Sequence, residues 1–294
     1  MRETSHQPGS LALSNNGDLS LYFVGCGSAF SRTMNQNNLL VVKGKDHLLI
    51  DCGTKTPQAL YERRIDLTAI SHFLITHSHA DHIGGLEEVM MVNRYVTGRK
   101  PTMIINEAYQ ELLWNNSLRG GTAYSEVRNG EPLGFEDFWQ IQRPQQLAGI
   151  ERESWHTTLG SIDIVMPRTM HFPDNAQSWR DSCWSCAVLF DERVLFTSDT
   201  RFDPQLLHEL DGRYSLEMIF HDCQFFKGGV HASLEELATL PSEMKSRMVL
   251  MHYSDNWQQF QGEVMAAGFR GLVKQGSSYT FPAVGLKTTS VSAR

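Results

Sequence analysis

Four histidine and aspartate side chains between positions 77 and 82 have the types and the spacing to bind metal ions. Residues 76–85 read THSHADHIGG, and imidazole and carboxylate groups are good ligands for zinc, manganese and iron. His77 and His79 alternate at the end of a predicted strand and therefore point the same way, whereas Asp81 and His82 enter the following turn. Four ligands divided two and two predict a site for two metal ions.

Three more candidate ligands occur further along the chain, each close to the end of an apolar run. His171 follows VMPRTM, Asp199 follows VLFTS and His252 follows VLM. A single histidine or aspartate at such a position is more often structural. Three such residues occur here, in the order along the chain that the remaining ligands of a two-metal site would require, and this favours metal ligation.

The segments around these residues predict two comparable halves of alternating strands and helices. Apolar, β-rich runs predict strands at 19–25, 37–44, 47–53, 69–76, 161–167, 185–190, 193–200, 215–223 and 247–255. Apolar residues at helical spacing after Gly84 predict a helix directly behind the HSHADH run, and 233–241 and 258–269 are predicted to be helical as well. Two such halves indicate an α/β protein, an αββα sandwich of two mixed β-sheets flanked by helices.

Length, composition and charge bound the domain organisation and the compartment. The chain has 294 residues, of which 41% are hydrophobic, and this is enough for a full core. We expect residues 1–18 to be a loose lead-in, 19–294 to form one domain, and the irregular stretch 112–160 to form an inserted lid or arm. Five cysteines, an odd number, and no signal-peptide pattern favour a cytoplasmic location without a membrane partner. The net charge of −7 argues against a large nucleic acid as partner.

The run THSHADHIGG, with the three later candidates behind it, resembles the metallo-β-lactamase superfamily from Leu19 to about Phe281. The resemblance implies two divalent metal ions, zinc in the first place and manganese as the alternative. It implies that the ligands of the first ion are His77, His79 and His171, that those of the second are Asp81, His82 and His252, and that Asp199 bridges the two ions. Asp51, in LLIDCG, would orient a ligand histidine.

The C-terminal half narrows the resemblance to one branch of the superfamily. The runs HDCQ at 221–224, VHAS at 230–233 and HYS at 252–254 are similar to the motif series of tRNase Z and its phosphodiesterase relatives. In that branch the acid, here Asp222, orients the extra histidine, here His231, which donates a proton to the leaving oxygen; His221 would lie in the same outer shell. Cleavage of a phosphodiester needs an activated hydroxide, positive charge on the phosphate oxygens and an acid for the departing alkoxide. The catalytic candidates are therefore Asp81, Asp222 and His231.

The runs GCGSAFS at 25–31 and LLWNNSLRGG at 112–121 resemble the compact anti-Pycsar enzymes of this branch. This implies a homodimer that hydrolyses 3′,5′-cyclic nucleotides, small anionic substrates, to nucleoside monophosphates through a hydroxide held between two metals. Aromatic residues of the insert are then candidates to stack on a base or cover the pocket: Trp114, Tyr124, Phe135, Phe138 and Trp139. The alternatives are a tRNase Z-like endoribonuclease that processes RNA 3′ ends, a thioester or lactone hydrolase, and a non-catalytic metal-binding or dimerisation module.

Overall fold

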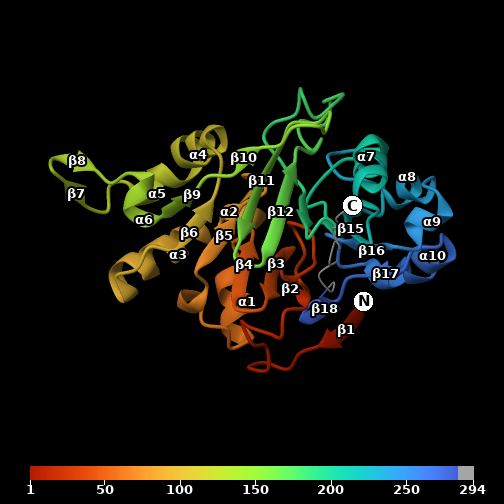
Figure 1. The fold of residues 1–294 in the computed structure, drawn as a ribbon, viewed down its shortest axis with the longest axis horizontal. Coiled ribbons are helices and arrows are strands. Elements are labelled where there is room, and N and C mark those ends of the chain that lie inside the picture. Colours follow the sequence, from red (N-terminus) through yellow and green to blue (C-terminus); the bar gives the residue numbers. More distant parts are fainter. Residues whose placement is uncertain (284–294) are drawn as a thin grey trace, which may run out of the picture.

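A computed structural model describes residues 1–283 and contains two eight-stranded mixed sheets whose inner faces share one apolar core (Figure 1). The first sheet contains, in spatial order, β1 (Arg2–Ser5), β18 (Ser277–Phe281), β2 (Leu19–Gly25), β3 (Asn38–Lys43), β4 (Asp46–Ile50), β5 (His72–Leu74), β6 (Thr102–Ile104) and β9 (Gln140–Gln142). The second contains β10 (Gln145–Gln146), β11 (Ser154–Leu159), β12 (Ile162–Pro167), β13 (Val188–Phe190), β14 (Val194–Phe196), β15 (Met218–Asp222), β16 (Met248–Met251) and β17 (Gly271–Leu272). Strands β4 to β9 of the first sheet run parallel, as do β14 to β17 of the second.

The central strands are apolar on both faces because both faces are covered. Along β2, Leu21 and Phe23 point into the core between the sheets, whereas Tyr22 and Val24 pack with the helices outside. The run is therefore almost continuously hydrophobic, as expected of a strand buried on both sides. Phe23 joins the two sheets, since its ring centroid lies 5.2 Å from that of Phe220 in β15.

Helices cover the outer face of each sheet and complete the predicted αββα sandwich. On the first sheet, buried residues come from α1 (Thr56–Glu62), α3 (Leu86–Val92) and α4 (Glu107–Leu113). On the second they come from α7 (Pro204–Tyr214), α8 (Leu234–Ala238), α9 (Ser242–Lys245) and α10 (Gln261–Ala266). The other helical segments are α2 (Ala80–Ile83), α5 (Arg119–Thr122), α6 (Phe135–Phe138), η1 (Leu67–Ala69), η2 (Asn93–Thr97), η3 (Trp114–Leu118) and η4 (Trp257–Gln259). Within residues 1–283, none of the helices combines the length and the apolar character that crossing a membrane requires.

The predicted insert at 112–160 divides into a projecting arm and strands that belong to the sheets. Helices α5 and α6 and the hairpin of β7 (Val127–Arg128) and β8 (Glu131–Pro132) extend away from the sandwich (Figure 1). The strands β9, β10 and β11, however, extend the edges of the two sheets. Their sequences are rich in glutamine and threonine, so they lack the apolar alternation by which strands are recognised.

The beginning of the chain is also more ordered than its sequence indicates. Residues 2–5, within the stretch expected to be a loose lead-in, form β1 and pair antiparallel with β18. All four side chains of β1 are exposed, so the pairing depends on backbone hydrogen bonds and leaves no hydrophobic pattern. Residues 284–294, which fall inside the predicted domain 19–294, lie outside the described residues.

Candidate metal centre

Asp51 and most of the candidate ligands lie just beyond the carboxyl ends of parallel strands, whereas His171 follows the antiparallel strand β12. Asp51 follows β4 and His77 follows β5 in the first sheet, while Asp199 and His252 follow β14 and β16 in the second. The carboxyl ends of parallel strands are where α/β proteins place ligands. Three of these junctions pass through left-handed backbone, at Asp51 (φ 63°), Ser198 (φ 50°) and His252 (φ 60°). The chain therefore turns sharply where the candidate site begins.

Asp81 and His82 are positioned by α2, the short helix that follows the end of β5. The backbone oxygen of His79 accepts a hydrogen bond from the His82 amide at 2.9 Å and so starts the helix. The helix packs so closely on the segment after β4 that only glycine fits at position 53, because a Cβ there would lie 2.0 Å from the Asp81 carbonyl oxygen. The Asn38 side chain links the two segments, donating to that oxygen at 3.2 Å and accepting from the Gly53 amide at 2.7 Å.

His77, His79 and His171 form a first ligand cluster together with Asp199. The Nε2 atoms of His77 and His171 each lie 3.1 Å from Nδ1 of His79. Oδ2 of Asp199 lies 3.8 Å from the His77 nitrogen and 3.9 Å from the His171 nitrogen. A tetrahedral zinc ion with Zn–N bonds of about 2.0–2.1 Å separates its ligand atoms by about 3.4 Å. The spacing of these four donor atoms therefore fits one metal ion.

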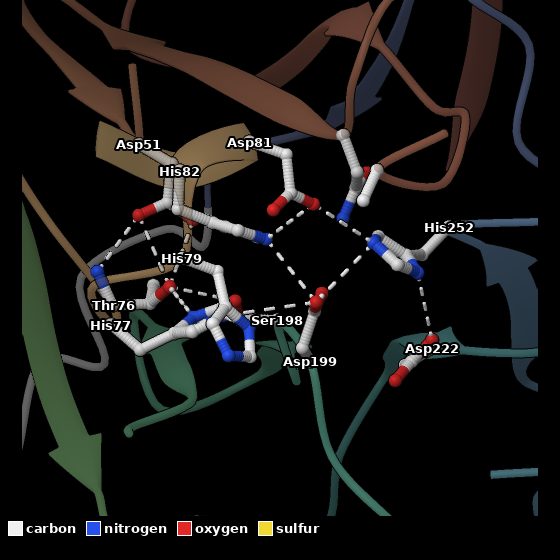
Figure 2. Close-up of polar contacts among 12 residues, drawn as sticks. Asp51, Thr76, His77, His79, Asp81, His82, Ser198, Asp199, Asp222 and His252 are labelled. Atoms are coloured by element: carbon white, nitrogen blue, oxygen red, sulfur yellow. Dashed lines mark hydrogen bonds and ion pairs between the residues drawn. The ribbon is translucent and has the colours of Figure 1, made fainter. Parts of the chain in front are cut away.

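Asp81, His82, Asp199 and His252 form a second ligand cluster (Figure 2). Nε2 of His82 lies 3.2 Å from Oδ2 of both aspartates, and Nε2 of His252 lies 3.3 Å from Asp81 and 3.2 Å from Asp199. Within each cluster the donor atoms are all less than 4.8 Å apart. Oδ1 of Asp199 is buried and has no hydrogen-bond partner among the described residues. The arrangement fits two divalent ions that share the Asp199 carboxylate.

Two of the ligand histidines turn their other ring nitrogen to an oxygen atom, and this fixes the orientation of both rings. Nδ1 of His82 donates to Oδ2 of Asp51 at 2.7 Å, and Nδ1 of His171 donates to the backbone oxygen of Val230 at 2.7 Å. Asp51 is held in turn by the backbone amide of Thr76 at 2.8 Å. The structure thus places Asp51 where the sequence predicts it, behind a candidate ligand, and the two Nε2 atoms face the clusters.

Burial and opposing charge shift the pKa values of the clustered groups in different directions. Burial lowers the pKa of His77 well below its ordinary value and that of His171 to about 4, so both rings are neutral and able to bind a metal ion. Burial also disfavours charge on His82 and His252, but the surrounding carboxylates, of which Asp199 contributes most, together outweigh burial and raise the pKa of both rings. Without cations these two rings carry protons that balance the carboxylates, and bound cations would replace those protons.

His231 and Asp222 form a hydrogen-bonded pair beside the second cluster. Oδ2 of Asp222 accepts from Nδ1 of His231 at 2.8 Å and from the Thr200 amide at 3.0 Å, while Oδ1 lies 3.4 Å from Nδ1 of His252. The Asp222 side chain is fully buried, whereas that of His231 is 21% exposed, so Nε2 of His231 remains available to a ligand. His221 makes a local contact instead, since its Nδ1 donates to the Asp222 carbonyl oxygen at 2.7 Å.

Most of the aromatic residues of the insert pack into the apolar layer that covers the outer face of the first sheet. Phe135, Phe138 and Trp139 are each at most 2% exposed, and the ring of Trp114 meets that of Phe135 edge-on at a centroid distance of 5.9 Å. The ring of Trp139 also lies 5.4 Å from that of Phe73 in β5. The expectation that these residues stack on a base is therefore wrong for the three buried rings, because they complete the apolar layer on the outer face of the first sheet. Tyr124, in contrast, is 67% exposed.

Sequence reasoning did not single out Asp255, three residues after His252. Its carboxylate accepts hydrogen bonds from the Arg32 amide at 2.7 Å and from the amide and hydroxyl of Thr33 at 3.2 Å and 2.7 Å. The loop after β2 is thereby tied to the ligand-bearing loop after β16. Thr33 and Asp255 are 222 positions apart, and no periodicity in the sequence marks such a pair.

The chain matches one family model, described as Anti-Pycsar protein Apyc1, over residues 19–279. It is 40% identical over 245 residues to the Anti-Pycsar protein Apyc1 of Bacillus phage BSP38, a match that covers 81% of this chain and 90% of the relative. It is 37% identical over 246 residues to the protein of the same name from Paenibacillus harenae, covering 83% and 93% of the two chains.

Among solved structures, the fold is similar to that of the metallo-beta-lactamase fold protein YhfI from Bacillus subtilis. The TM-score is 0.62 at 15% sequence identity, and the match covers 90% of this chain and 99% of the other. The predicted fold and family are confirmed, and with them the expectation of an enzyme, a metal-dependent hydrolase. The chain belongs to the Anti-Pycsar protein Apyc1 family.

Proposed function

We propose that this protein is a phosphodiesterase that opens 3′,5′-cyclic nucleotides to nucleoside monophosphates with the help of two divalent metal ions. The observation that carries the proposal is the Asp222–His231 pair beside two ligand clusters that share Asp199. An acid next to a metal centre suits a reaction with a poor leaving group, such as the alkoxide of a cyclic nucleotide. A thioester has a better leaving group and would not require one. Membership in the Apyc1 family supports the choice of substrate.

The two clusters would hold the ions, with Asp199 common to both. Zinc suits the histidine-rich first cluster, and manganese is the alternative. When bound, the ions supply an activated water and positive charge at the phosphate. The protein's own contribution is orientation, because Asp51 and the Val230 carbonyl hold the rings of His82 and His171 in place before a substrate arrives.

His231 is positioned to hold and to move a proton at one defined atom. Its Nδ1–H is committed to Asp222 at 2.8 Å, so the proton available to a substrate is on Nε2. His231 and His252 line the same cavity, and their ring centroids are 4.6 Å apart. A phosphodiester bound at the clusters therefore has its leaving oxygen close to His231. Proton transfer from Nε2 lets that oxygen depart as an alcohol, and the hydrogen bond to Asp222 holds the ring in position.

The assembly and the cellular setting are part of the proposal. We infer from the family resemblance that the enzyme is a homodimer, a state that light scattering measures directly. All five cysteines, which lie within the described residues, are free, in keeping with a reducing cytoplasm. The core that both sheets share supports one domain for the described part of the chain, with β1 as an edge strand of its first sheet.

The decisive experiment compares substrates on one preparation whose metal content has been measured. We expect the protein loaded with zinc or manganese to hydrolyse 3′,5′-cyclic nucleotides, to leave a precursor tRNA uncut and to spare a thioester. Cleavage of the tRNA with the cyclic nucleotides untouched would establish the endoribonuclease alternative. Turnover of the thioester alone would contradict phosphodiester chemistry, and a fully metal-loaded protein without any turnover would contradict an enzymatic role.

A further inference from the structure

A cavity of about 550 Å³ opens beside the second ligand cluster, with His231 and His252 in its lining. The other walls come from the loop after β2, from the loop after β15 and from the loop after β16. A phosphate bound at the clusters lies at one side of this cavity. The rest of the substrate would therefore occupy the cavity itself, whose volume is within the range of small-molecule sites.

Two phenylalanines line this cavity with most of their surface exposed. Phe30 is 90% exposed and Phe226 is 64% exposed, and they come from two different loops. Phe30 is the most exposed large hydrophobic residue among residues 1–283. Leaving such rings in water costs free energy that burial would recover, and two of them at one concave site indicate an apolar, planar ligand.

The loop that carries Phe30 is held rigidly rather than left free. Its backbone turns at Ser31, whose amide donates to the Ser28 carbonyl at 3.1 Å. The Ser28 amide in turn donates to the backbone oxygen of Tyr253 at 3.0 Å. Asp255 binds the next two residues, as described above, and also accepts from the Ser31 hydroxyl. Phe30 is therefore exposed because hydrogen bonds hold its loop in this conformation, and not because the loop lacks a fixed conformation.

Phe226 is directed outward by its neighbour in the sequence. Phe225 stacks on Phe260, with ring centroids 4.3 Å apart and planes 5° from parallel, so it anchors the loop to the protein while Phe226 stays exposed. The amide of Gln224 donates to the Ala232 carbonyl at 2.8 Å and closes the base of the loop. The same loop carries His231, so Phe226 and the proposed proton donor share one support.

We propose that Phe30 and Phe226 form an aromatic clamp that stacks on the nucleobase of the substrate and so positions its phosphate at the ligand clusters. This inference rests on the proposed function, because it needs a substrate with both a phosphodiester and a planar base. Stacking uses the face of the ring, which every base presents. The clamp therefore contributes binding to the base and takes no part in the chemistry at phosphorus.

The test compares Phe30→Ala and Phe226→Ala with Tyr61→Ala, which removes an exposed aromatic ring that is not part of this cavity. Two probes are used: cyclic AMP, and the 3′,5′-cyclic phosphate of 1-deoxyribose, which lacks the base. For cyclic AMP we expect KM to rise about tenfold in each clamp variant with kcat little changed. For the abasic probe we expect the kinetics of all proteins to be equal, and Tyr61→Ala should match the unmodified protein throughout.

The failures of the clamp and of the proposed function give different results. If the unmodified protein hydrolyses neither probe, the phosphodiesterase assignment is wrong, and calorimetric binding of cyclic AMP to the same proteins decides on the clamp. If cyclic AMP is hydrolysed and KM stays within twofold in both variants, the clamp is wrong. A changed sedimentation coefficient with an unchanged KM would also overturn it, because the two rings would then contact another copy of the chain.

Discussion

Replacing His231 with alanine should slow the cleavage of cyclic nucleotides without emptying the metal site. Nδ1 of this ring is held by Asp222 at 2.8 Å, so one nitrogen, Nε2, remains to act on a substrate. The ring is 21% exposed, whereas the rings of His77, His82, His171 and His252 are at most 2% exposed. If His231 is the proton donor, kcat for a cyclic nucleotide should fall about 10²–10⁴-fold, the usual contribution of such a group.

The identity of the leaving group makes this prediction specific. Bis(p-nitrophenyl) phosphate releases p-nitrophenolate, a stable anion that needs no proton, so His231→Ala should cleave it at close to the unmodified rate. Turnover of both substrates is measured on samples whose zinc and manganese content is determined by atomic spectroscopy. His208→Ala is the matched control, because His208 is an exposed histidine on α7 outside the clusters.

Two results would refute this reasoning. His231, Asp199, Asp222 and His252 also lie within ligand distance of one another, so a loss of bound metal in His231→Ala would make His231 a ligand. An equal loss of rate on both substrates, with metal retained, would show that His231 acts before proton transfer, for example in holding the phosphate.

Three further predictions test the supports of the site and of the fold. Asp51→Asn, in which asparagine tolerates the left-handed backbone, should weaken metal binding about 10–100-fold by releasing His82; unchanged affinity in a metal titration would contradict this. Phe23→Ala should lower the free energy of unfolding by about 3–5 kcal/mol, because it leaves a cavity in the core between the sheets. An unchanged urea concentration at the midpoint of unfolding would contradict this prediction. The paired hydrogen bonds from Arg247, both 2.8 Å, lower the pKa of Asp211, so Asp211→Asn should cost about 1 kcal/mol at pH 7. That difference should begin to shrink as the pH falls below the ordinary pKa of 3.8, where the unfolded chain's carboxyl binds a proton, and should vanish at the lower pH at which the native carboxyl is protonated as well; a gap that stays constant with pH would count against the ion pair.

The sequence predicts the strand ends and the candidate ligands well because both leave local signals. Strands buried on both faces, such as β2, read as unbroken apolar runs, and the candidate ligands follow them within a few residues. Asp222 reaches His231 because both residues lie on segments that Thr200 holds together: its amide donates to Asp222 and its carbonyl accepts from the Ala232 amide.

Other features depend on neighbours that are distant in the sequence. The strand β1 is fully exposed and pairs only through its backbone, so its side chains carry no signal. The link between Asp255 and the loop of Phe30 arises only once the two sheets have packed together. For the aromatic residues of the insert, composition alone does not distinguish a pocket wall from a core, and most of them pack into the apolar layer outside the first sheet.

The shared carboxylate of Asp199 has a consequence for how the protein is made. The candidate ligands from the first sheet, His77 to His82, leave the ribosome long before His252, which follows β16 of the second sheet. A partly synthesised chain therefore offers only half of a metal site, and a half-site binds cations weakly because its opposing ligands are not yet in place. Both clusters are therefore complete only after the chain has been made past His252 and the two sheets have packed together, so a pair of cations bound there would mark a folded molecule.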